Sequence, residues 1–211
     1  MKRINGAILA GVAALAFGAT AASAQTIGFK AGASLSNLSI DGSTEGLDYR
    51  TGFVGGGFIR FGFGRLGIQP EILSVTKGAE LDDPAGDESI SIEYVAIPVL
   101  LHLPLTYGAS FAPYIMGGPE FAFDIGCEQE VGGVEVDCDD AGVDEFQRKS
   151  LDIGLSAGGG LAFAVGPGAL LVEGRYTWGL TNIQEVETES EVKNRSAYLM
   201  AGYSIPLGRR Y

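Results

Sequence analysis

The chain has 211 residues, a formal net charge of −12 and 33 glycines, which suits one domain. A chain this acidic repels phosphate, so nucleic acid is excluded as a partner. Beyond the amino end, no apolar stretch reaches the roughly 18 residues of a membrane helix. If the mature chain spans a membrane it does so as a closed β-barrel, because only helices and closed barrels satisfy every backbone group in lipid.

The first 24 residues predict a secretory signal peptide. Lys2 and Arg3 precede an apolar run rich in alanine, and Ala22-Ser23-Ala24 has the small residues of a cleavage site. A retained membrane helix is the alternative, and the cleavage pattern disfavours it. Cleavage removes two basic residues and no acidic one, so the charge changes from −12 to −14 (−12 − 2). We therefore expect a signal peptide over 1–24 and one barrel domain over 25–211.

Eight segments of the mature chain are expected to be strands. Most are longer than the roughly 5–6 residues of an ordinary globular strand and suit the crossing of a bilayer at a tilt. The segments are Thr26–Ser39, Thr51–Phe63, Gly67–Lys77, Ile90–Leu103, Phe111–Ile125, Ser150–Val165, Ala169–Ile183 and Arg195–Leu207.

Apolar residues alternate with polar or small ones along most of these segments. Phe29 alternates with Lys30 in the first segment, and Trp178 with Arg175 and Glu173 in the seventh. Successive strand side chains point to opposite faces, and in a membrane barrel the apolar face meets lipid while the polar face lines the lumen. Six aromatic residues are expected to face lipid, some of them in the girdles at the two interfaces: Tyr94, Phe121, Phe123, Tyr176, Trp178 and Tyr203.

The fourth segment alternates poorly. Val95 to Leu101 is apolar throughout, and Pro98 indicates a bulge. We expect Glu93 to face the lumen and its neighbours Ile92 and Tyr94 to face lipid.

The connections between segments alternate in length. Short connections lie near Gly64–Leu66, Pro104–Ser110 and Gly166–Gly168; long ones run over Ile40–Arg50, Gly78–Ser89, Gly126–Lys149 and Gln184–Asn194. This alternation is typical of outer-membrane barrels, which have short periplasmic turns and long extracellular loops. Six of the 26 acidic residues lie in the strand segments, which leaves 20 (26 − 6) for the long loops. The sequence therefore predicts acidic extracellular loops.

The two cysteines, Cys127 and Cys138, lie close together in a chain that we expect to be exported. A disulfide closing a short loop is the natural interpretation. Two thiols without a nearby histidine make at best half a metal site. The best cluster for a divalent cation is Asp137, Asp139 and Asp140, but its spacing does not match an EF-hand loop and acidic surface loops are usually solvated, so we assign no metal and no cofactor.

Charged side chains on the polar faces are expected to fill the lumen, because an eight-stranded barrel is just wide enough for side chains. Buried charges need partners, so a salt-bridge network is favoured over a conducting path. Glu173 and Arg175 are two residues apart, and we expect each to pair across strands. The candidates are Lys30, Arg60, Glu71, Glu93, Glu120, Asp152, Glu173 and Arg175, with Lys77 and Asp124 as further members.

Paired carboxylates also suggest a hydrolase, and small barrels that modify lipids need a nucleophile beside a base. The single histidine, His102, has Leu101, Leu103 and Pro104 as sequence neighbours, and none of them is a nucleophile. We therefore expect no catalysis.

Several motifs, in order, resemble the bacterial outer-membrane β-barrel domain family often labelled "porin family protein". The matching segments are 69–73 (QPEIL), 93–101 (EYVAIPVLL), 113–119 (PYIMGGP), 152–155 (DIGL), 173–183 (EGRYTWGLTNI) and 194–196 (NRS), spread over nearly all of the mature chain. The resemblance implies an eight-stranded barrel in an outer membrane and no particular substrate. Such barrels usually end on an aromatic residue that closes the last strand, whereas here Gly208-Arg209-Arg210 precedes Tyr211.

We therefore predict an all-β fold, an eight-stranded antiparallel up-and-down transmembrane β-barrel. The expected function is non-enzymatic: structural, adhesive or weakly porin-like, with a lumen filled by side chains. Outer-membrane lipid is the expected partner, with divalent cations at the acidic loops, and the barrel is expected to be a monomer. The alternative is a soluble, lipocalin-like periplasmic barrel that binds an apolar ligand, in which the strand faces are inverted.

Overall fold

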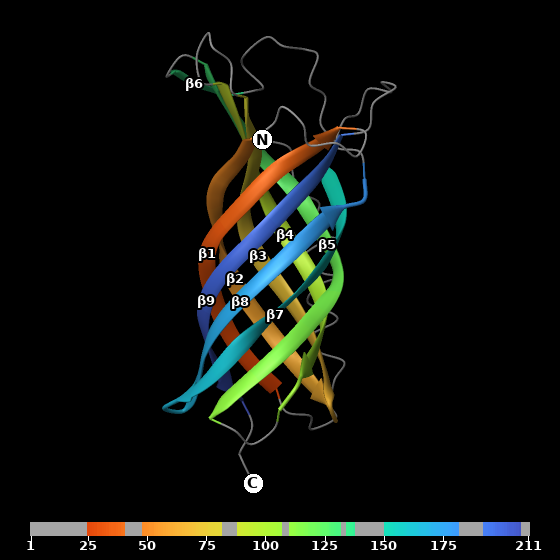
Figure 1. Cartoon of the computed structure of the whole chain (residues 1–211), viewed down its shortest axis with the longest axis vertical. Helices are drawn as coiled ribbons and strands as arrows, with labels where there is room; N and C mark the ends of the chain where they lie inside the picture. Colours follow the sequence, from red (N-terminus) through yellow and green to blue (C-terminus); the bar gives the residue numbers. More distant parts are fainter. Residues whose placement is uncertain are drawn as a thin grey trace.

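The computed structural model describes residues 25–40, 48–81, 88–106, 110–131, 134–137, 150–181 and 192–207. The described residues form a tall barrel of tilted strands (Figure 1). The strands are β1 (Gln25–Ile40), β2 (Asp48–Phe63), β3 (Leu66–Leu81), β4 (Glu88–Pro104), β5 (Phe111–Val131), β6 (Val134–Asp137), β7 (Leu151–Val165), β8 (Gly168–Gly179) and β9 (Val192–Pro206). No helix in these ranges has the length and hydropathy needed to span a membrane.

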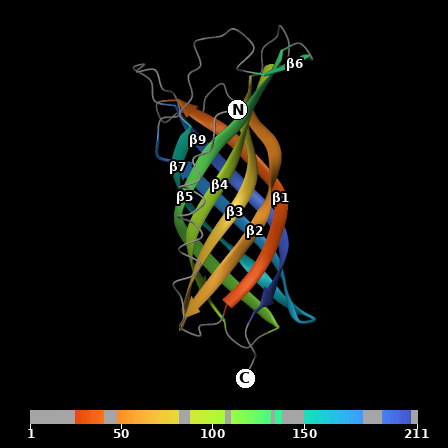
Figure 2. The ribbon, with the colours of Figure 1, turned by 180° about the vertical axis from the view of Figure 1, so that it is seen from behind.

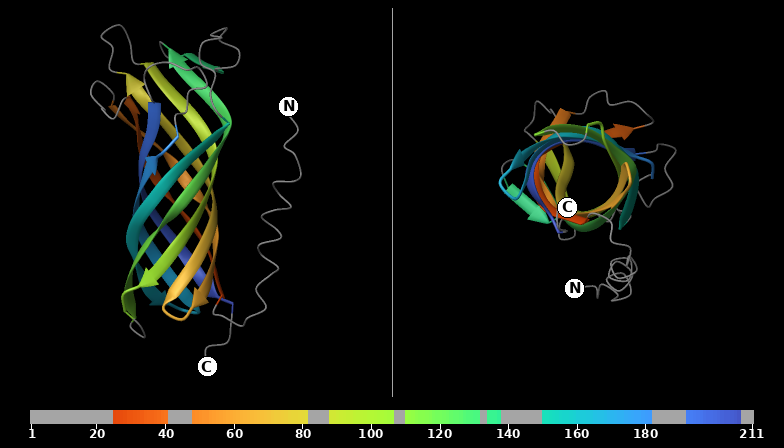
Figure 3. Two further views of the ribbon diagram at one scale, coloured as in Figure 1. Left: turned by 90° about the vertical axis from the view of Figure 1, so that its right-hand side faces the viewer. Right: turned by 90° about the horizontal axis from the view of Figure 1, so that it is seen from below.

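Eight of the strands close into a ring in which every neighbouring pair is antiparallel. The order around the ring is β4-β3-β2-β1-β9-β8-β7-β5, and β5 pairs with β4 to complete it. The first and last strands meet in long register, from Thr26 opposite Pro206 to Ile40 opposite Val192. The closed ring is visible from below in Figure 3 and from behind in Figure 2. The prediction of an eight-stranded up-and-down barrel is confirmed.

The strands differ from the predicted segments mainly at their loop ends. β5 has 21 residues and runs on to Val131, where β6 folds back on it as a short hairpin that lies outside the ring. This hairpin falls in the predicted long loop Gly126–Lys149, so part of that loop is strand. β8 ends at Gly179, earlier than the predicted Ile183.

Two of the turns at the opposite end of the barrel depend on glycine. Phe63 pairs with Leu66 and Val165 with Gly168, which leaves two residues in each turn. The first of the two is Gly64 with φ +63° and Gly166 with φ +58°, respectively. A type II′ hairpin turn has glycine at this position, since other residues adopt positive φ at a steric cost.

Large apolar side chains cover the outside of the barrel, and the charged side chains of the strands lie inside it, together with two clusters of buried apolar residues. Phe29 is 64% exposed and Leu199 65% exposed, whereas Lys30 and Met200, the next residues along their strands, are each 2% exposed. Ring closure places the apolar face outward and gives the charged residues the interior. The lipocalin-like alternative requires the opposite strand faces, with the polar side chains outside, and nothing in the described residues supports it.

The fourth segment is where the predicted faces fail. Ile92 and Tyr94 are buried inside, and Glu93 is exposed on the outer wall. The irregularity lies in the pairing of β4 with β5, where Glu93 opposes Gly126 but Tyr94 opposes Asp124, so Ile125 is an extra residue. The bulge is on β5, and the pattern of β4 could not reveal it because both faces of β4 are apolar.

Several predictions concern residues outside the described ranges. They are the signal peptide over 1–24, the closing aromatic Tyr211, and the loop residues Cys138, Asp139 and Asp140. These stay predictions.

Candidate functional site

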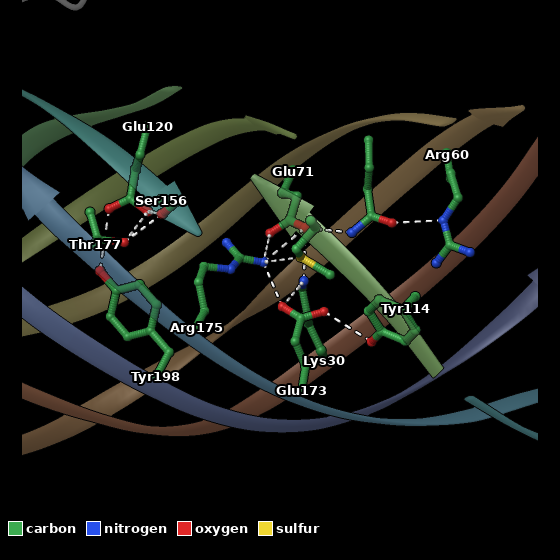
Figure 4. Close-up of polar contacts among 12 residues, drawn as sticks. Lys30, Arg60, Glu71, Tyr114, Glu120, Ser156, Glu173, Arg175, Thr177 and Tyr198 are labelled. Atoms are coloured by element: carbon green, nitrogen blue, oxygen red, sulfur yellow. Dashed lines mark hydrogen bonds and ion pairs between the residues drawn. The ribbon is translucent and has the colours of Figure 1, made fainter. Parts of the chain in front are cut away.

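The interior of the barrel, with its charged and polar side chains, is the candidate site, and all eight strands of the ring contribute side chains to it. Each strand contributes residues of one parity, because alternate side chains point inward. β1, β3 and β8 supply the charges at mid-height, and β5, β7 and β9 supply hydroxyl and carboxylate groups nearer the long loops. Figure 4 shows these residues facing one another across the lumen.

The central cluster consists of two cations and two carboxylates. The ammonium of Lys30 lies 2.7 Å from Glu71 Oε1 and 2.8 Å from Glu173 Oε1. Arg175 Nη2 donates to both acids, at 2.9 Å to Glu71 Oε2 and 2.6 Å to Glu173 Oε1. Each cation therefore contacts both carboxylates, and all four side chains are at most 2% exposed.

The ion pair between Arg175 and Glu71 crosses the full width of the barrel. Arg175 is on β8 and Glu71 on β3, and these strands are four positions apart in a ring of eight. Direct contact at 2.9 Å between opposite walls blocks the lumen at this level. Gly158, opposite Arg175 on β7, lets the two strands approach closely at this level, since a Cβ there would lie 2.7 Å from the Cα of Arg175.

The central cluster extends toward the short turns through Gln69 and Arg60. Gln69 donates to Glu71 Oε1 at 2.6 Å and accepts from Arg60 Nε at 2.7 Å. The ring of Phe58 lies between two cations, 5.4 Å from Lys30 Nζ and 5.6 Å from Arg60 Cζ. These contacts give Arg60 partners although no carboxylate lies within ion-pair distance in the described residues.

Tyr114 closes the same level from the side of β5. Its hydroxyl donates to Glu173 Oε2 at 3.2 Å, and its ring packs on His102 with centroids 4.6 Å apart. Gly160 on β7 makes room for it, because a Cβ there would lie 2.5 Å from the Tyr114 hydroxyl.

A second cluster, nearer the long loops, surrounds Glu120. Its carboxylate accepts from Ser156 at 2.9 Å, from Thr177 at 3.2 Å and from Tyr198 at 3.3 Å. Lys77 Nζ lies 3.3 Å from Glu120 Oε1. Four groups from four other strands therefore converge on one buried carboxylate.

Asp152 extends this second cluster toward the long loops. It accepts from Asn194 at 2.8 Å and from Thr181 at 2.9 Å, and it lies 3.8 Å from Lys77 Nζ. Lys77 also sits 5.1 Å from the centroid of the Tyr94 ring. The ammonium thus lies between two carboxylates and an aromatic face.

Seven of the eight residues assigned to the lumen network lie inside the barrel: Lys30, Arg60, Glu71, Glu120, Asp152, Glu173 and Arg175. Lys77 joins them. Asp124 is half-buried beside the bulge, where it accepts from the Gly126 N–H at 3.1 Å. Glu93 is on the outer wall, so its assignment to the lumen is wrong.

Glu173 and Arg175 do pair across strands, as expected, but they also contact each other. They contact each other at 2.6 Å and in addition pair across the barrel with Lys30 and Glu71. Residues two apart on a strand have well-separated Cα atoms. Their long side chains can still come into contact when both reach toward the same partners on the opposite wall.

Uncharged partners of the network were not among the predicted site residues. They are Gln69, Tyr114, Ser156, Thr177, Thr181, Asn194 and Tyr198. Each lies on the polar face of its strand, or just past its end in the case of Thr181. The alternation of inward and outward positions along each strand could have identified these residues from the sequence.

In the described residues, His102 does not lie beside a nucleophile. His102 is 3% exposed and stacks on Tyr114, and its Nε2 has no hydrogen-bond partner in the described chain. The hydroxyl of Ser156 donates to Glu120, and both groups are buried. No group of three metal-ligating side chains occurs in the described ranges.

Cys127 is buried and disulfide-bonded, and it lies on β5 opposite Ile92 of β4. Its expected partner, Cys138, follows β6 directly but lies outside the described residues. The hairpin register brings Glu128 opposite Asp137, so the chain turns back toward Cys127 at this point. The pairing of the two cysteines stays a prediction.

Comparison with known proteins identifies the family. The model of the outer membrane protein beta-barrel domain family matches residues 22–185. The fold is similar to Neisserial surface protein A (16% identity, TM-score 0.50, covering 85% of this chain and 96% of that one). It is also similar to OprG from Pseudomonas aeruginosa (13% identity, TM-score 0.52, covering 87% and 97%). A search of curated proteins found no match.

These two likenesses support the fold alone, because the identities are low. The family match covers most of the chain and agrees with the closed ring, the apolar outer wall and the polar lumen. The protein belongs to the outer membrane protein β-barrel domain family and lies in a bacterial outer membrane.

Proposed function

We propose that this protein is a closed, non-enzymatic outer-membrane barrel that carries its long acidic loops at the cell surface and does not conduct. The observation that carries the proposal is the ion pair between Arg175 and Glu71, which joins opposite walls at 2.9 Å. An eight-stranded barrel leaves only enough interior for side chains, so one such contact is sufficient to obstruct it.

The charge balance of the lumen supports the same conclusion. Four cations, Lys30, Arg60, Lys77 and Arg175, face four carboxylates, Glu71, Glu120, Asp152 and Glu173. A selective pore presents a surplus of one charge to the solute that it passes. Here Lys30, Lys77 and Arg175 contact carboxylates directly, and Arg60 is linked to Glu71 through Gln69, which suits a network that stabilises the barrel.

Burial supports the absence of catalysis. The hydroxyl and carboxylate groups that could act as nucleophile and base, Ser156, Thr177 and Glu120, are at most 3% exposed, and His102 is apart from them beside Tyr114. A substrate has no access to these groups while the network holds. A hydrolase or acyl transferase would need a nucleophile–base pair at an accessible surface.

The long loops are where a surface function would be located. They hold 20 of the 26 acidic residues (26 − 6 in strands, by the expected ranges). The β5–β6 hairpin places Glu128 opposite Asp137 and Glu130 opposite Glu135, and like charges directly opposite destabilise a hairpin. A divalent cation would relieve this repulsion, and structural or adhesive roles through such loops are the surface functions that we propose.

Planar-bilayer recording of the purified monomeric barrel tests the proposal. We expect no stepwise conductance in wild-type protein whose folding is verified by heat-modifiable mobility on a detergent gel. Reproducible unitary currents from the folded form would contradict a closed lumen and favour the weakly porin-like role. Calcium binding by the loops is tested separately, by isothermal titration calorimetry of the same sample with calcium. The variant for comparison is Asp137→Asn.

A further inference from the structure

The lumen is packed at mid-height but opens at the end with the short turns. The four charged side chains of the central cluster are at most 3% exposed. Below them, toward the periplasm, the inward-facing residues of most strands are small and are half-buried or exposed. They leave a recess that we call the vestibule, at the end of the barrel seen from below in Figure 3. These small residues are Thr26, Gly28, Gly62, Ala112, Ala162, Ala164 and Ala169.

Arg60 lies at the inner end of the vestibule with most of its donors unused. Its Nε donates to Gln69 at 2.7 Å, which is its one hydrogen bond within the part of the chain that the structure describes. Nη1 and Nη2 have no partner there and are not among the fully buried nitrogen atoms, so a ligand can reach them from the vestibule. Figure 4 shows a dashed line at Nε of Arg60 and none at its two terminal nitrogens.

Three neighbours hold the Arg60 side chain in place. Gln69 accepts from Nε, and the Phe58 ring lies 5.6 Å from Cζ. Gly67 lies against the stem, since a Cβ there would be 3.2 Å from Arg60 Cγ. The edge that remains, Nη1 and Nη2, can donate two parallel hydrogen bonds to a carboxylate or a phosphate group. A guanidinium that is already fixed loses little conformational freedom when it binds such a group.

His102 provides a second unused polar group beside Arg60. It is 3% exposed, and its Nε2 has no hydrogen-bond partner in the described chain. It lies on β4 opposite Gly67, the residue against which the Arg60 stem packs. Because Gly67 has no side chain, β3 places nothing between the imidazole and the guanidinium. A buried polar atom without a partner costs free energy, and an oxyanion held by Arg60 would supply an acceptor for Nε2–H.

No acidic residue competes with a ligand at this end of the barrel. The central cluster is neutral, with two cations and two carboxylates in direct contact, so Arg60 adds a positive charge below it. None of the described inward-facing residues between this cluster and the periplasm is acidic. The short connections contain no Asp or Glu either, over 64–66, 104–110 and 166–168. Low-dielectric walls around one sign of charge focus its field on ions of the opposite sign.

We propose that the vestibule binds a small oxyanion from the periplasm, with the Nη1–Nη2 edge of Arg60 as the anchor and His102 as a second donor. The ligand class is a carboxylate or a phosphate group, because both present two oxygens that match the guanidinium fork. The ion pair between Arg175 and Glu71 closes the lumen above, so the oxyanion is held without being transported. Binding itself does not require a closed lumen, so the conductance test and the test below can fail independently.

Nitrogen NMR of the folded barrel in a non-ionic detergent, which supplies no anionic group, tests the site. His102 is the only histidine of the chain, so its imidazole signals report the vestibule without further assignment. Sodium acetate and sodium phosphate are titrated separately at constant pH, each replacing sodium chloride at constant ionic strength. We expect a saturable shift of the Nε2 signal, and the oxyanion that binds more tightly identifies the ligand class. Sodium bromide lacks paired oxygens and should cause no saturable shift.

Four variants locate the site. Arg60→Gln should weaken binding at least about tenfold, because a hydrogen bond to a charged group contributes about that factor or more. Arg60→Lys keeps the charge without the fork and should bind with intermediate affinity. Ala112→Phe keeps Arg60 but fills the vestibule from β5, and should abolish the shift. Arg195→Gln removes the same charge from the wall of β9 opposite Trp178, and should leave the affinity unchanged.

Equal effects of bromide and acetate would overturn the proposal, since only charge would then matter. Wild-type affinity in a folded Arg60→Gln variant would also overturn it, because the anchor would lie elsewhere. Equal losses in Arg60→Gln and Arg195→Gln would refute a defined site in favour of net charge. Every variant is first checked for heat-modifiable mobility on a detergent gel, so that unfolding is not mistaken for lost affinity.

Discussion

Replacing Arg175 by leucine tests the lumen network most directly. The change removes one buried cation and keeps much of the side-chain volume. Arg175 Nη2 makes hydrogen bonds of 3.1 and 2.9 Å to Glu71 and of 2.6 Å to Glu173. In the variant Lys30 remains as the nearest cation for both carboxylates.

The expected loss in the free energy of unfolding is about 3 kcal/mol or somewhat more. Removing one partner of a buried ion pair costs about 3–5 kcal/mol, because the other charge stays buried without compensation. The lower end applies here, since Lys30 still pairs with both acids. Arg175 Nε and Nη1 are buried and have no hydrogen-bond partner among the described residues, so leucine also removes two unsatisfied donors.

Urea unfolding in lipid vesicles, followed by Trp178 fluorescence and by gel mobility, measures this loss. Arg65→Leu, in the exposed β2–β3 turn, is the control and should cost less than about 1 kcal/mol. Conductance should stay low in Arg175→Leu, because Lys30, Glu71 and Glu173 still occupy the lumen. A variant with wild-type stability that acquires a large conductance would refute the reasoning, since Arg175 would then close a path without stabilising the barrel.

Three further substitutions test other parts of the interior and the wall. Glu120→Gln should lower the free energy of unfolding by about 3 kcal/mol in the same urea assay, because Lys77 at 3.3 Å loses its nearest carboxylate; a loss below 1 kcal/mol would show that Asp152 alone suffices. Gly160→Ala should cost about 1–3 kcal/mol by overpacking, since the new Cβ would lie 2.5 Å from the Tyr114 hydroxyl, and an unchanged urea midpoint would contradict the tight fit. Glu93→Gln should change stability by less than about 0.5 kcal/mol because Glu93 is exposed on the outer wall, and a loss of several kcal/mol would return Glu93 to the network.

The faces of most strands could be predicted because each strand alternates cleanly. Phe29 and Lys30 have opposite chemistry and adjacent positions, so one choice of outward face settles the whole of β1. β4 lacked this contrast. Val95 to Leu101 is apolar on both sides, and the extra residue Ile125 that sets its register with β5 lies on another strand.

The individual contacts of the lumen could not be predicted from the sequence. Arg175 and Glu71 are 104 residues apart, and the sequence around either residue does not indicate that the other is its partner. Their contact depends on strand order, which puts β8 opposite β3, and on the stagger of the ring, which sets their heights. The uncharged partners of Glu120 depend on the same two properties.

The sequence by itself determined the class of protein, the number of strands in the ring and which residues carry its charges, because strand periodicity and loop length are local properties of the chain. Only the tertiary structure decided which charges meet, that Glu93 is outside, and that Arg195 lies opposite Trp178. The physical reason is that ring closure combines the register of eight strands, and a shift of one residue in any pair changes every contact across the lumen.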